Sequence, residues 1–316
     1  MRKPIDKPRP SCYNVDNPIG ETKVNPIERK ERFVKMKNEL DRRRKYYLIL
    51  DCETATLPIA SKWSEEKRKK VSIAKPLIYD LGWTIVDKKG NIYRRQSFLI
   101  SEIFSVPQVF NTAYYKDKRP IYLERLRHSA TILTDWKSAT DALVHDMGLV
   151  DGVGAYNAMF DFKKALPFTE LYISKVYSED YYEWEENQFR ICEDIAEGKR
   201  KESSQTFDPD HFTFRGVTYN LFDVWGLACR HILNCDEYRE LCSNNGWVTP
   251  SGLYYKSSAE TAFRFCAEDY NFEEAHTALD DAEIESFIFS IVNKRTKGKF
   301  KMGIEYFPFK LIGKIS

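Results

Sequence analysis

The sequence predicts an α/β fold in which a sheet is flanked by helices. An apolar run at 46–50 is followed by two β-rich runs at 77–86 and 92–100, and apolar residues recur at helical spacing from residue 136 onward. The chain has 316 residues, enough to bury a substantial core, and its 42% hydrophobic and 30% charged content is ordinary for a globular protein.

Composition excludes several classes of protein. The chain has no apolar run of about 18 residues and no charged start followed by an apolar block, so neither a membrane span nor a secretory signal is expected. The seven cysteines are odd in number and scattered, which favours a reducing compartment. We therefore expect a cytoplasmic protein, and the aromatic, lysine-rich and glutamate-rich composition is compatible with a bacterial cell or a phage-infected host.

The densest cysteine group could in principle bind zinc. It consists of Cys229, His231, Cys235 and Cys242. Its spacing matches no common zinc arrangement, and Cys229 also falls on a predicted apolar helix face. We interpret these cysteines as small buried hydrophobic residues.

The N-terminal segment 1–45 differs from the rest in charge, with fourteen Lys/Arg against seven Asp/Glu. Such a basic arm attracts polyanions, although a disordered solubilising extension has the same composition. At 25–28 an N-cap, a proline at the first helical position and a following glutamate predict a helix over 26–44. We therefore separate residues 1–45, partly disordered and partly helical, from the domain that follows.

The middle elements follow in chain order. A polar segment at 61–72 is expected to be helical or mobile, and 87–91 is expected to be the hairpin turn between the two β-rich runs. Apolar spacing from Trp136 to Val150 predicts a helix that begins at Thr134 or Asp135.

The later elements repeat the alternation of strand and helix. A strand passing into a helix is expected at 219–228, and a capping box at 257–260 predicts the start of another helix. A long apolar face after Leu279 predicts a C-terminal helix. Residues 295–316 are expected to be a basic tail.

The stretch 169–216 is interpreted as an insertion. It is rich in aromatic residues, which can stack on unpaired bases, but it holds twelve Asp/Glu against six Lys/Arg. Because an acidic surface repels a phosphate chain, a lid or a partner-binding subdomain is the favoured interpretation.

Two carboxylates follow the first apolar run. Side chains alternate along a strand, so Asp51 and Glu53 lie on one face about 7 Å apart. Two neighbouring carboxylates at the end of a buried strand repel each other. They are tolerated only if they are exposed to solvent, protonated or neutralised by a metal. Alone, this pattern also fits a solvated strand end.

Two later stretches bring further acids to helix starts. Asp161 follows a short strand and a turn of small residues, and Asp281 lies in the first turn of the C-terminal helix, with His276 in the loop before it. Each has an ordinary explanation, because acids near a helix N-terminus are favoured by the helix dipole. Asp280 is a rival for the position of Asp281.

Together these stretches resemble the DEDDh family of 3′-to-5′ exonucleases, and within it the polymerase III epsilon proofreading subunits. The resemblance is compatible with a bacteriophage-encoded member. The family motifs match Asp51, Glu53 and Thr54, then Asn157, Phe160 and Asp161, then His276, Ala278, Asp281 and Ala282. The resemblance covers residues 46–294 and favours Asp281 over Asp280 by spacing. It implies a ribonuclease-H-like mixed five-stranded sheet.

The resemblance also implies a mechanism. Asp51, Glu53, Asp161 and Asp281 are expected to hold two Mg²⁺ or Mn²⁺ ions, which suit hard oxygen ligands. His276 is expected to accept the proton of the attacking water.

The resemblance implies a substrate site as well. Thr54, Tyr156, Asn157 and Phe160 are expected near the terminal nucleotide. Two departures affect its base and sugar preference: residues 55–58 are Ala-Thr-Leu-Pro, and Tyr156 stands where many members have histidine.

The implied activity is removal of 5′-mononucleotides from the 3′ end of single-stranded DNA or a frayed end. The alternatives are an enzyme that trims RNA or degrades short oligoribonucleotides, and a non-catalytic nucleic-acid-binding protein that retains the fold. Proofreading would require a polymerase or another replication partner.

Overall fold

The computed structural model describes residues 40–41, 43–57, 64–199 and 208–315. The chain forms two compact units, Met1–Arg44 and Lys45–Ser316, and the description below concerns the second. The helix expected over 26–44 lies outside the described residues, apart from a few residues at its end. Of these, 40, 43 and 44 form bends and a turn rather than helix.

A seven-stranded mixed sheet forms the centre of the second unit, in the order β4-β3-β2-β1-β5-β7-β6. Its strands are β1 (Tyr46–Thr56), β2 (Pro76–Asp87), β3 (Ile92–Ile100), β4 (Ile132–Thr134), β5 (Gly152–Ala155), β6 (His211–Phe214) and β7 (Val217–Asp223). β1, β2 and β3 form an antiparallel meander, and β5 and β7 continue the sheet parallel to β1.

This strand arrangement confirms the predicted α/β fold class, a mixed sheet flanked by helices. The predicted number of strands was too small. β4 pairs with β3 at one edge and β6 pairs with β7 at the other, which makes seven strands rather than five.

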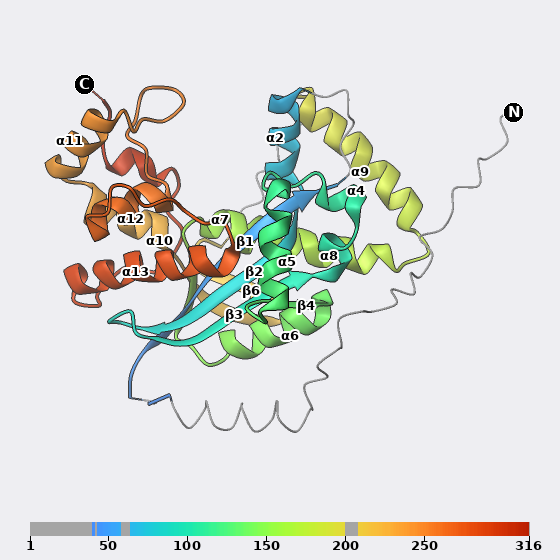
Figure 1. Ribbon diagram of the computed structural model, residues 1–316, viewed down its shortest axis with the longest axis horizontal. Helices are drawn as coiled ribbons and strands as arrows, with labels where there is room; N and C mark the ends of the chain where they lie inside the picture. The colour runs from blue at the N-terminus through green and yellow to red at the C-terminus, as the bar shows by residue number, and fades with distance from the viewer. Residues whose placement is uncertain (1–39, 42, 58–63, 200–207, 316) are drawn as a thin grey trace, which may run out of the picture. The chain divides into compact units, whose positions relative to one another are not determined.

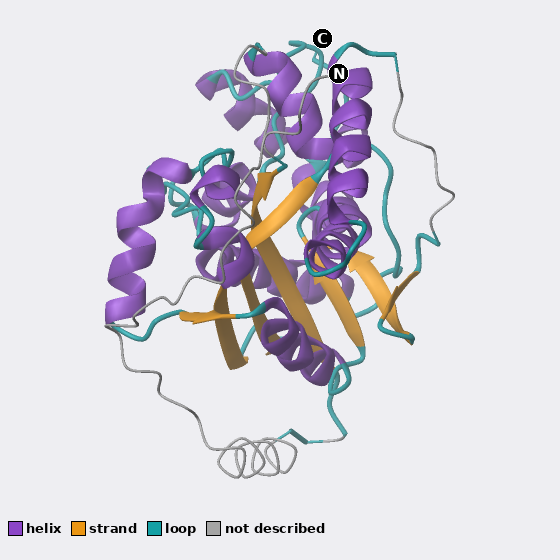
Figure 2. Ribbon diagram, turned by 90° about the vertical axis from the view of Figure 1, so that its right-hand side faces the viewer, coloured by secondary structure: helices purple, strands orange, loops and turns teal. Residues whose placement is uncertain are grey.

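Helices cover both faces of the sheet (Figure 1; Figure 2). In the first half of the chain they are α2 (Glu65–Ala74), α3 (Ser101–Phe104), α4 (Pro107–Phe110), η1 (Lys116–Lys118), α5 (Arg119–Arg127) and α6 (Trp136–Met147). After β5 follow α7 (Ala158–Phe160), η2 (Asp161–Ala165), α8 (Leu166–Val176) and α9 (Tyr181–Ala196). The last are α10 (Val224–Ala228), η3 (Cys229–Leu233), α11 (Asp236–Asn245), α12 (Ala259–Ala267), α13 (Ala278–Thr296) and η4 (Pro308–Leu311).

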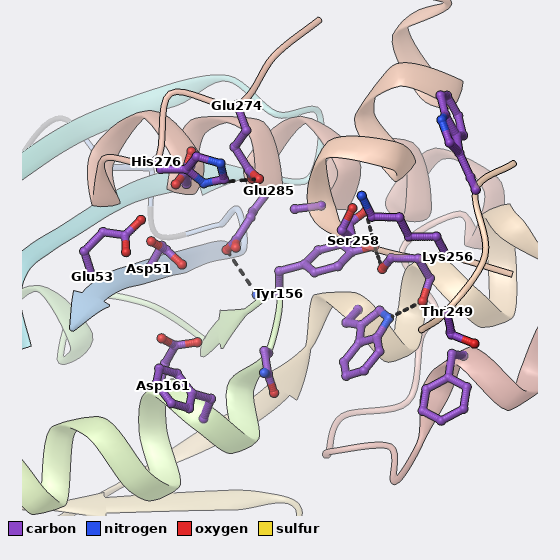
Figure 3. A pocket seen from close by; sticks show the side chains of 18 of the residues that line it. Asp51, Glu53, Tyr156, Asp161, Thr249, Lys256, Ser258, Glu274, His276 and Glu285 are labelled. Carbon is purple, nitrogen blue, oxygen red and sulfur yellow. Dashed lines mark hydrogen bonds and ion pairs between the residues drawn. The ribbon is translucent and has the colours of Figure 1, made fainter. Parts of the chain in front are cut away.

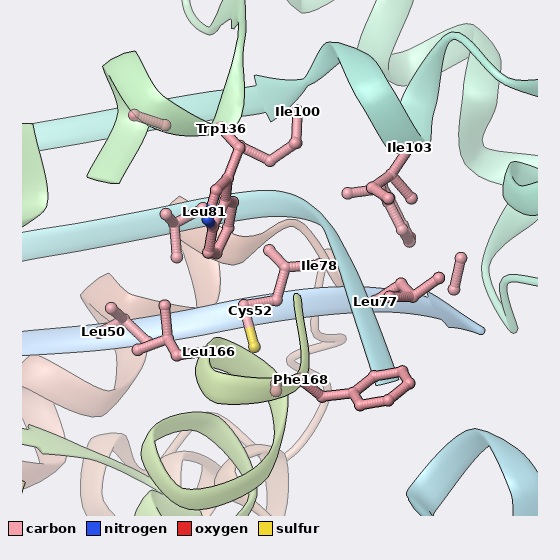
Figure 4. Packing of buried hydrophobic residues seen from close by; sticks show 14 of the residues in the cluster. Leu50, Cys52, Leu77, Ile78, Leu81, Ile100, Ile103, Trp136, Leu166 and Phe168 are labelled. Atoms are coloured by element: carbon pink, nitrogen blue, oxygen red, sulfur yellow. The ribbon is translucent and has the colours of Figure 1, made fainter. Parts of the chain in front are cut away.

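β1 is buried on both faces because its alternate side chains enter two different hydrophobic clusters. Leu48 and Leu50 pack in a cluster that includes Trp136 of α6 and Leu166 of α8 (Figure 4). Ile49 packs in a cluster built from α10, α12 and α13. A strand covered on both sides is apolar throughout, which explains the continuous run at 46–50. By the same alternation, Asp51 and Glu53 have the parity of Ile49 and face α13.

Polar caps determine where two helices begin. The Asp135 side chain accepts a hydrogen bond from the Ser138 amide at 2.7 Å, so Asp135 rather than Thr134 starts α6. The capping box predicted at 257–260 was wrong by one residue. Ser258 is the N-cap of α12, and the Glu260 side chain instead pairs with Arg264 at 3.1 Å.

The stretch set apart as an insertion, 169–216, contributes to both the core and the periphery. Phe212 and Phe214 of β6 are buried in the first cluster, and α9 packs against α2. The presumed tail also packs against the domain. Gly303 donates to the Leu221 carbonyl at 2.7 Å, and Ile312 is buried, so residues 303–312 are part of the folded unit.

Candidate active site

Asp51 and Glu53 lie on strand β1, which packs against α13. Asp51 lies opposite Gly82 of β2 in the antiparallel register, and a bulge follows Glu53. A Cβ atom on Gly82 would lie 2.2 Å from the Leu279 amide nitrogen, so only glycine allows the first turn of α13 to lie this close to the sheet. The close approach brings α13 beside Asp51.

Asp161 begins a π-helical turn directly after the short helix α7. Its backbone amide donates to the Asn157 carbonyl at 3.1 Å, and its carboxylate accepts a hydrogen bond from the Cys52 thiol at 2.9 Å. Isolated π turns inside helices are common at functional sites because they alter the direction of a side chain. Here the Asp161 carboxylate points toward Asp51 (Figure 3).

Helix α13 supplies Asp281 and, one turn later, Glu285. Both side chains are buried. Asp80 of β2 accepts a hydrogen bond from the Ala278 amide at 2.9 Å and so anchors the start of α13. The Glu285 carboxylate accepts the Tyr156 amide at 3.1 Å, which links α13 to the end of β5.

His276 stands beside these acids in a left-handed conformation, with φ of 53°. Its Nδ1 lies 3.6 Å from a Glu274 carboxylate oxygen, and Tyr122 donates to its backbone carbonyl at 3.3 Å. Ligand atoms of Glu53, His276 and Asp281 all lie within 4.8 Å of one another, which is close enough for one cation to bind all three.

Burial raises the pKa of every acid in this cluster, and neighbouring carboxylates raise it further for all of them except Asp161. Burial raises the pKa of Asp161 to about 7 and, together with the charges of Glu274, Asp280 and Asp80, that of Asp281 to about 8. The pKa values of Asp51, Glu53 and Glu285 are raised further, again by burial first and by neighbouring carboxylates second. In a metal-free chain, these carboxyl groups therefore retain their protons to a higher pH than exposed carboxyl groups do.

The cluster fits hard divalent cations. Its donors are carboxylate oxygens and one imidazole, and Asp281 Oδ1 is buried without a hydrogen-bond partner. Among the described residues, the charge of Lys118 lowers the pKa of Glu53, but burial and the neighbouring carboxylates outweigh it. Oxygen ligands of this kind suit Mg²⁺ or Mn²⁺.

All five residues predicted to act in catalysis meet in one cavity of about 870 Å³. Asp280, the rival of Asp281, does not line this cavity and forms an ion pair with Arg125 at 2.8 Å. Figure 3 shows Asp51, Glu53, Asp161 and His276 around its acidic end.

Three of the four residues predicted to bind the substrate line this cavity. Asn157, Phe160 and Tyr156 line the cavity, but the Tyr156 hydroxyl donates to the Ser257 carbonyl at 2.9 Å and the side chain is buried. Thr54 follows the bulge in β1 and is not among the residues found to line the cavity.

Sequence reasoning missed two acids that line the same cavity, Glu274 and Glu285. Burial raises the pKa of Glu274 to about 7. Spacing offered a signal for Glu285, because residues four apart share a helix face and Glu285 follows Asp281 by four. No comparable pattern pointed to Glu274, which lies in a loop.

The cysteine-rich group does not form a metal site. Among the described residues, Glu53, His276 and Asp281 form the only group of three or more side chains close enough to bind one metal ion. Cys229 and Cys242 are buried free thiols in the second hydrophobic cluster, as expected for small hydrophobic residues.

Comparisons with known proteins add little to this geometry. No protein-family model matches the chain, and no curated protein matches it significantly. A solved structure of S. pombe Pop2p, in a form with Mg²⁺ and Mn²⁺ bound, aligns with 85% of this chain and 90% of its own at 14% identity and a TM-score of 0.39.

No described helix is both long enough and apolar enough to cross a membrane.

Proposed function

We propose that this protein is a metal-dependent 3′-to-5′ exonuclease that releases 5′-mononucleotides from single-stranded nucleic acid. The observation that supports this proposal is the convergence of Asp51, Glu53, Asp161, Asp281 and His276, from four separate segments, in one cavity. Four carboxylates beside one histidine are more than a structural role requires, because their repulsion destabilises the metal-free fold.

Asp51, Glu53, Asp161 and Asp281 would hold two divalent cations. Bound there, Mg²⁺ or Mn²⁺ would lower the pKa of an attacking water and stabilise the departing 3′ oxygen. The carboxylates would in turn be held ionised by the ions, and the buried positions of Asp161 and Asp281 would limit competing solvent.

His276 would accept the proton of the attacking water. Burial and the nearby charge of Lys118 lower its pKa, so its imidazole is neutral at neutral pH and able to accept a proton. Glu274, near Nδ1, favours a proton on that nitrogen and leaves Nε2 to act as the base.

Labelled DNA and RNA strands of the same sequence test the proposal. With Mn²⁺ the wild type is expected to release 5′-mononucleotides progressively from the 3′ end, and the faster of the two strands identifies the preferred sugar. We propose DNA as the preferred strand. Release from neither strand would refute the exonuclease proposal.

A pair of neighbouring variants provides the matched control. Asp281→Asn removes a proposed metal ligand and is expected to slow release by about a thousandfold or more. Asp280→Asn removes an equal charge from a side chain that pairs with Arg125, and is expected to change the rate by less than about fivefold. Equal effects of the two variants would contradict the assigned roles.

A further inference from the structure

The cavity extends beyond the acids to a second wall that no step of the proposed hydrolysis uses. This wall is formed by Trp225, Trp247, Lys256 and Phe309, which we call the aromatic arm. Figure 3 shows Lys256, one of these four residues, on the far side of Tyr156 from Asp51 and Glu53. The acidic end and the aromatic arm belong to one continuous cavity of about 870 Å³.

The aromatic arm is held in place by hydrogen bonds behind its surface. The Lys256 amide donates to the Trp247 carbonyl at 2.9 Å, and the Tyr238 hydroxyl donates to the Lys256 carbonyl at 2.7 Å. The Trp225 indole donates to the Ser257 hydroxyl at 2.9 Å. These hydrogen bonds tie the loop between α11 and α12 to α10 and to Tyr238 of α11.

Two of the three rings of the arm, Trp225 and Phe309, are stacked on one another. Trp225 is near-parallel to Tyr156 and to Phe309, with ring centroids 6.5 Å and 6.2 Å away. The Arg264 guanidinium lies 5.4 Å from the centre of the Trp247 ring, so a cation covers part of that side chain as well. Offset aromatic stacks of this kind offer flat apolar surface to a further ring.

The chemistry of the two ends differs. The acidic end would hold cations and a phosphate, whereas the residues of the aromatic arm include no carboxylate and one lysine. The Lys256 side chain is 45% exposed, and its ammonium lies 4.0 Å from the Glu260 carboxylate, so it can still contact an anion. A flat apolar surface with one cation fits a nucleobase and the phosphate attached to it.

We propose that the aromatic arm is a base-binding subsite. It takes an unpaired nucleobase from one of the last two nucleotides of the strand whose scissile phosphate lies at the acids. This inference rests on the proposed function and adds to it the place where a base of the substrate strand binds. A paired base cannot stack there, because its faces are occupied within the duplex.

Binding to strands that lack a base tests the subsite. Short fluorescent strands would carry an abasic position at the last or the penultimate nucleotide, and affinity would be measured by anisotropy with Mn²⁺ present. The Asp161→Ala background keeps the strands intact, because the proposed function requires Asp161. The intact strand is expected to bind about tenfold more tightly than the abasic strand that lacks the base bound in the subsite. The other abasic strand is expected to bind like the intact strand.

The variant Trp247→Ala is expected to remove this difference in affinity, because it weakens the binding of the intact strand and leaves the binding of the abasic strand unchanged. Trp247→Phe, which keeps a ring, is expected to retain most of it. Trp184→Ala is the matched control, because Trp184 of α9 is a partly buried indole that packs on Tyr172 and Tyr181. This control is expected to leave the difference unchanged.

The outcomes separate this inference from the proposed function. If Trp247→Ala weakens intact and abasic strands equally, or leaves the tenfold difference in place, the base-binding subsite is wrong, even when the wild type hydrolyses strands. If the wild type hydrolyses no strand, the exonuclease proposal fails, while loss of the base-dependent difference in Trp247→Ala would still establish the subsite.

Discussion

Tyr115 lies flat against the His276 ring, with centroids 4.3 Å apart and planes inclined by 15°. The contact holds the imidazole at the edge of the cavity, where its backbone has a positive φ and no helix or strand supports it. Stacking is therefore a principal restraint on the direction of the proposed base.

Removing this ring is expected to impair catalysis more than binding. Tyr115→Ala should lower kcat by about tenfold, because His276 would no longer be held in one orientation, while KM changes little. Tyr115→Phe keeps the stack and should retain nearly full activity. Steady-state rates with a short labelled strand measure both, and a Phe variant as slow as the Ala variant would assign the role to the hydroxyl instead.

The raised pKa values predict how pH affects the metal-free fold. Asp161 and Asp281 have pKa values of about 7 and about 8 in the folded chain, whereas unfolded aspartates titrate near pH 4. Between about pH 4 and about pH 8 the folded state therefore binds more protons, so its stability falls as pH rises through this window.

Thermal unfolding in EDTA measures this effect. The melting temperature should decrease from about pH 5.5 to about pH 8, and excess Mn²⁺ should raise it most at the higher pH, where the carboxylates bind the ion in ionised form. A melting temperature in EDTA that rises over the same interval would contradict the assigned electrostatics.

The Glu285 carboxylate is expected to lower the stability of the metal-free protein and to raise its affinity for the metal ion. In Glu285→Gln the amide oxygen can still accept the Tyr156 amide, but one charge is lost near Asp161 and Asp281. We expect a higher melting temperature in EDTA and a several-fold higher Mn²⁺ concentration for half-maximal activity.

Glu283→Gln is the control for this variant, because Glu283 lies on the same helix but pairs with the exposed Arg95. It should change neither quantity appreciably. An unchanged Mn²⁺ requirement in Glu285→Gln would mean that this acid does not contribute to the field at the metal site.

Gly82 is expected to be irreplaceable. Gly82→Ala would place a Cβ atom 2.2 Å from the backbone of Leu279 and force α13 away from the sheet, at a cost of about 3 kcal/mol or more. Because Asp281 and Glu285 move with that helix, metal binding should weaken as well.

Urea unfolding and Mn²⁺ titration measure the two effects. Gly148→Ala is a suitable comparison, because the nearest atom to its new Cβ would be 3.3 Å away and the cost should be smaller. Equal stability of the Gly82 and Gly148 variants would show that α13 has room to shift.

Much of the fold could be predicted from local pattern. The apolar run of β1, the meander of β2 and β3, and the apolar face of α13 are periodicities visible in one dimension. The short edge strands β4 and β6 could not be predicted, because strands of three and four residues acquire their conformation from the neighbours they pair with.

The sequence alone predicts the acids and the histidine of the proposed site, because spacing within each motif is a local property. Only the tertiary structure decided that Glu274 and Glu285 join them, that Asp280 turns instead to Arg125, and that Trp225, Trp247 and Phe309 complete the same cavity. The physical reason is that these relations depend on how closely α13 and the loop after α11 approach the sheet. That approach is governed by a missing side chain at Gly82 and by hydrogen bonds between segments far apart in the chain.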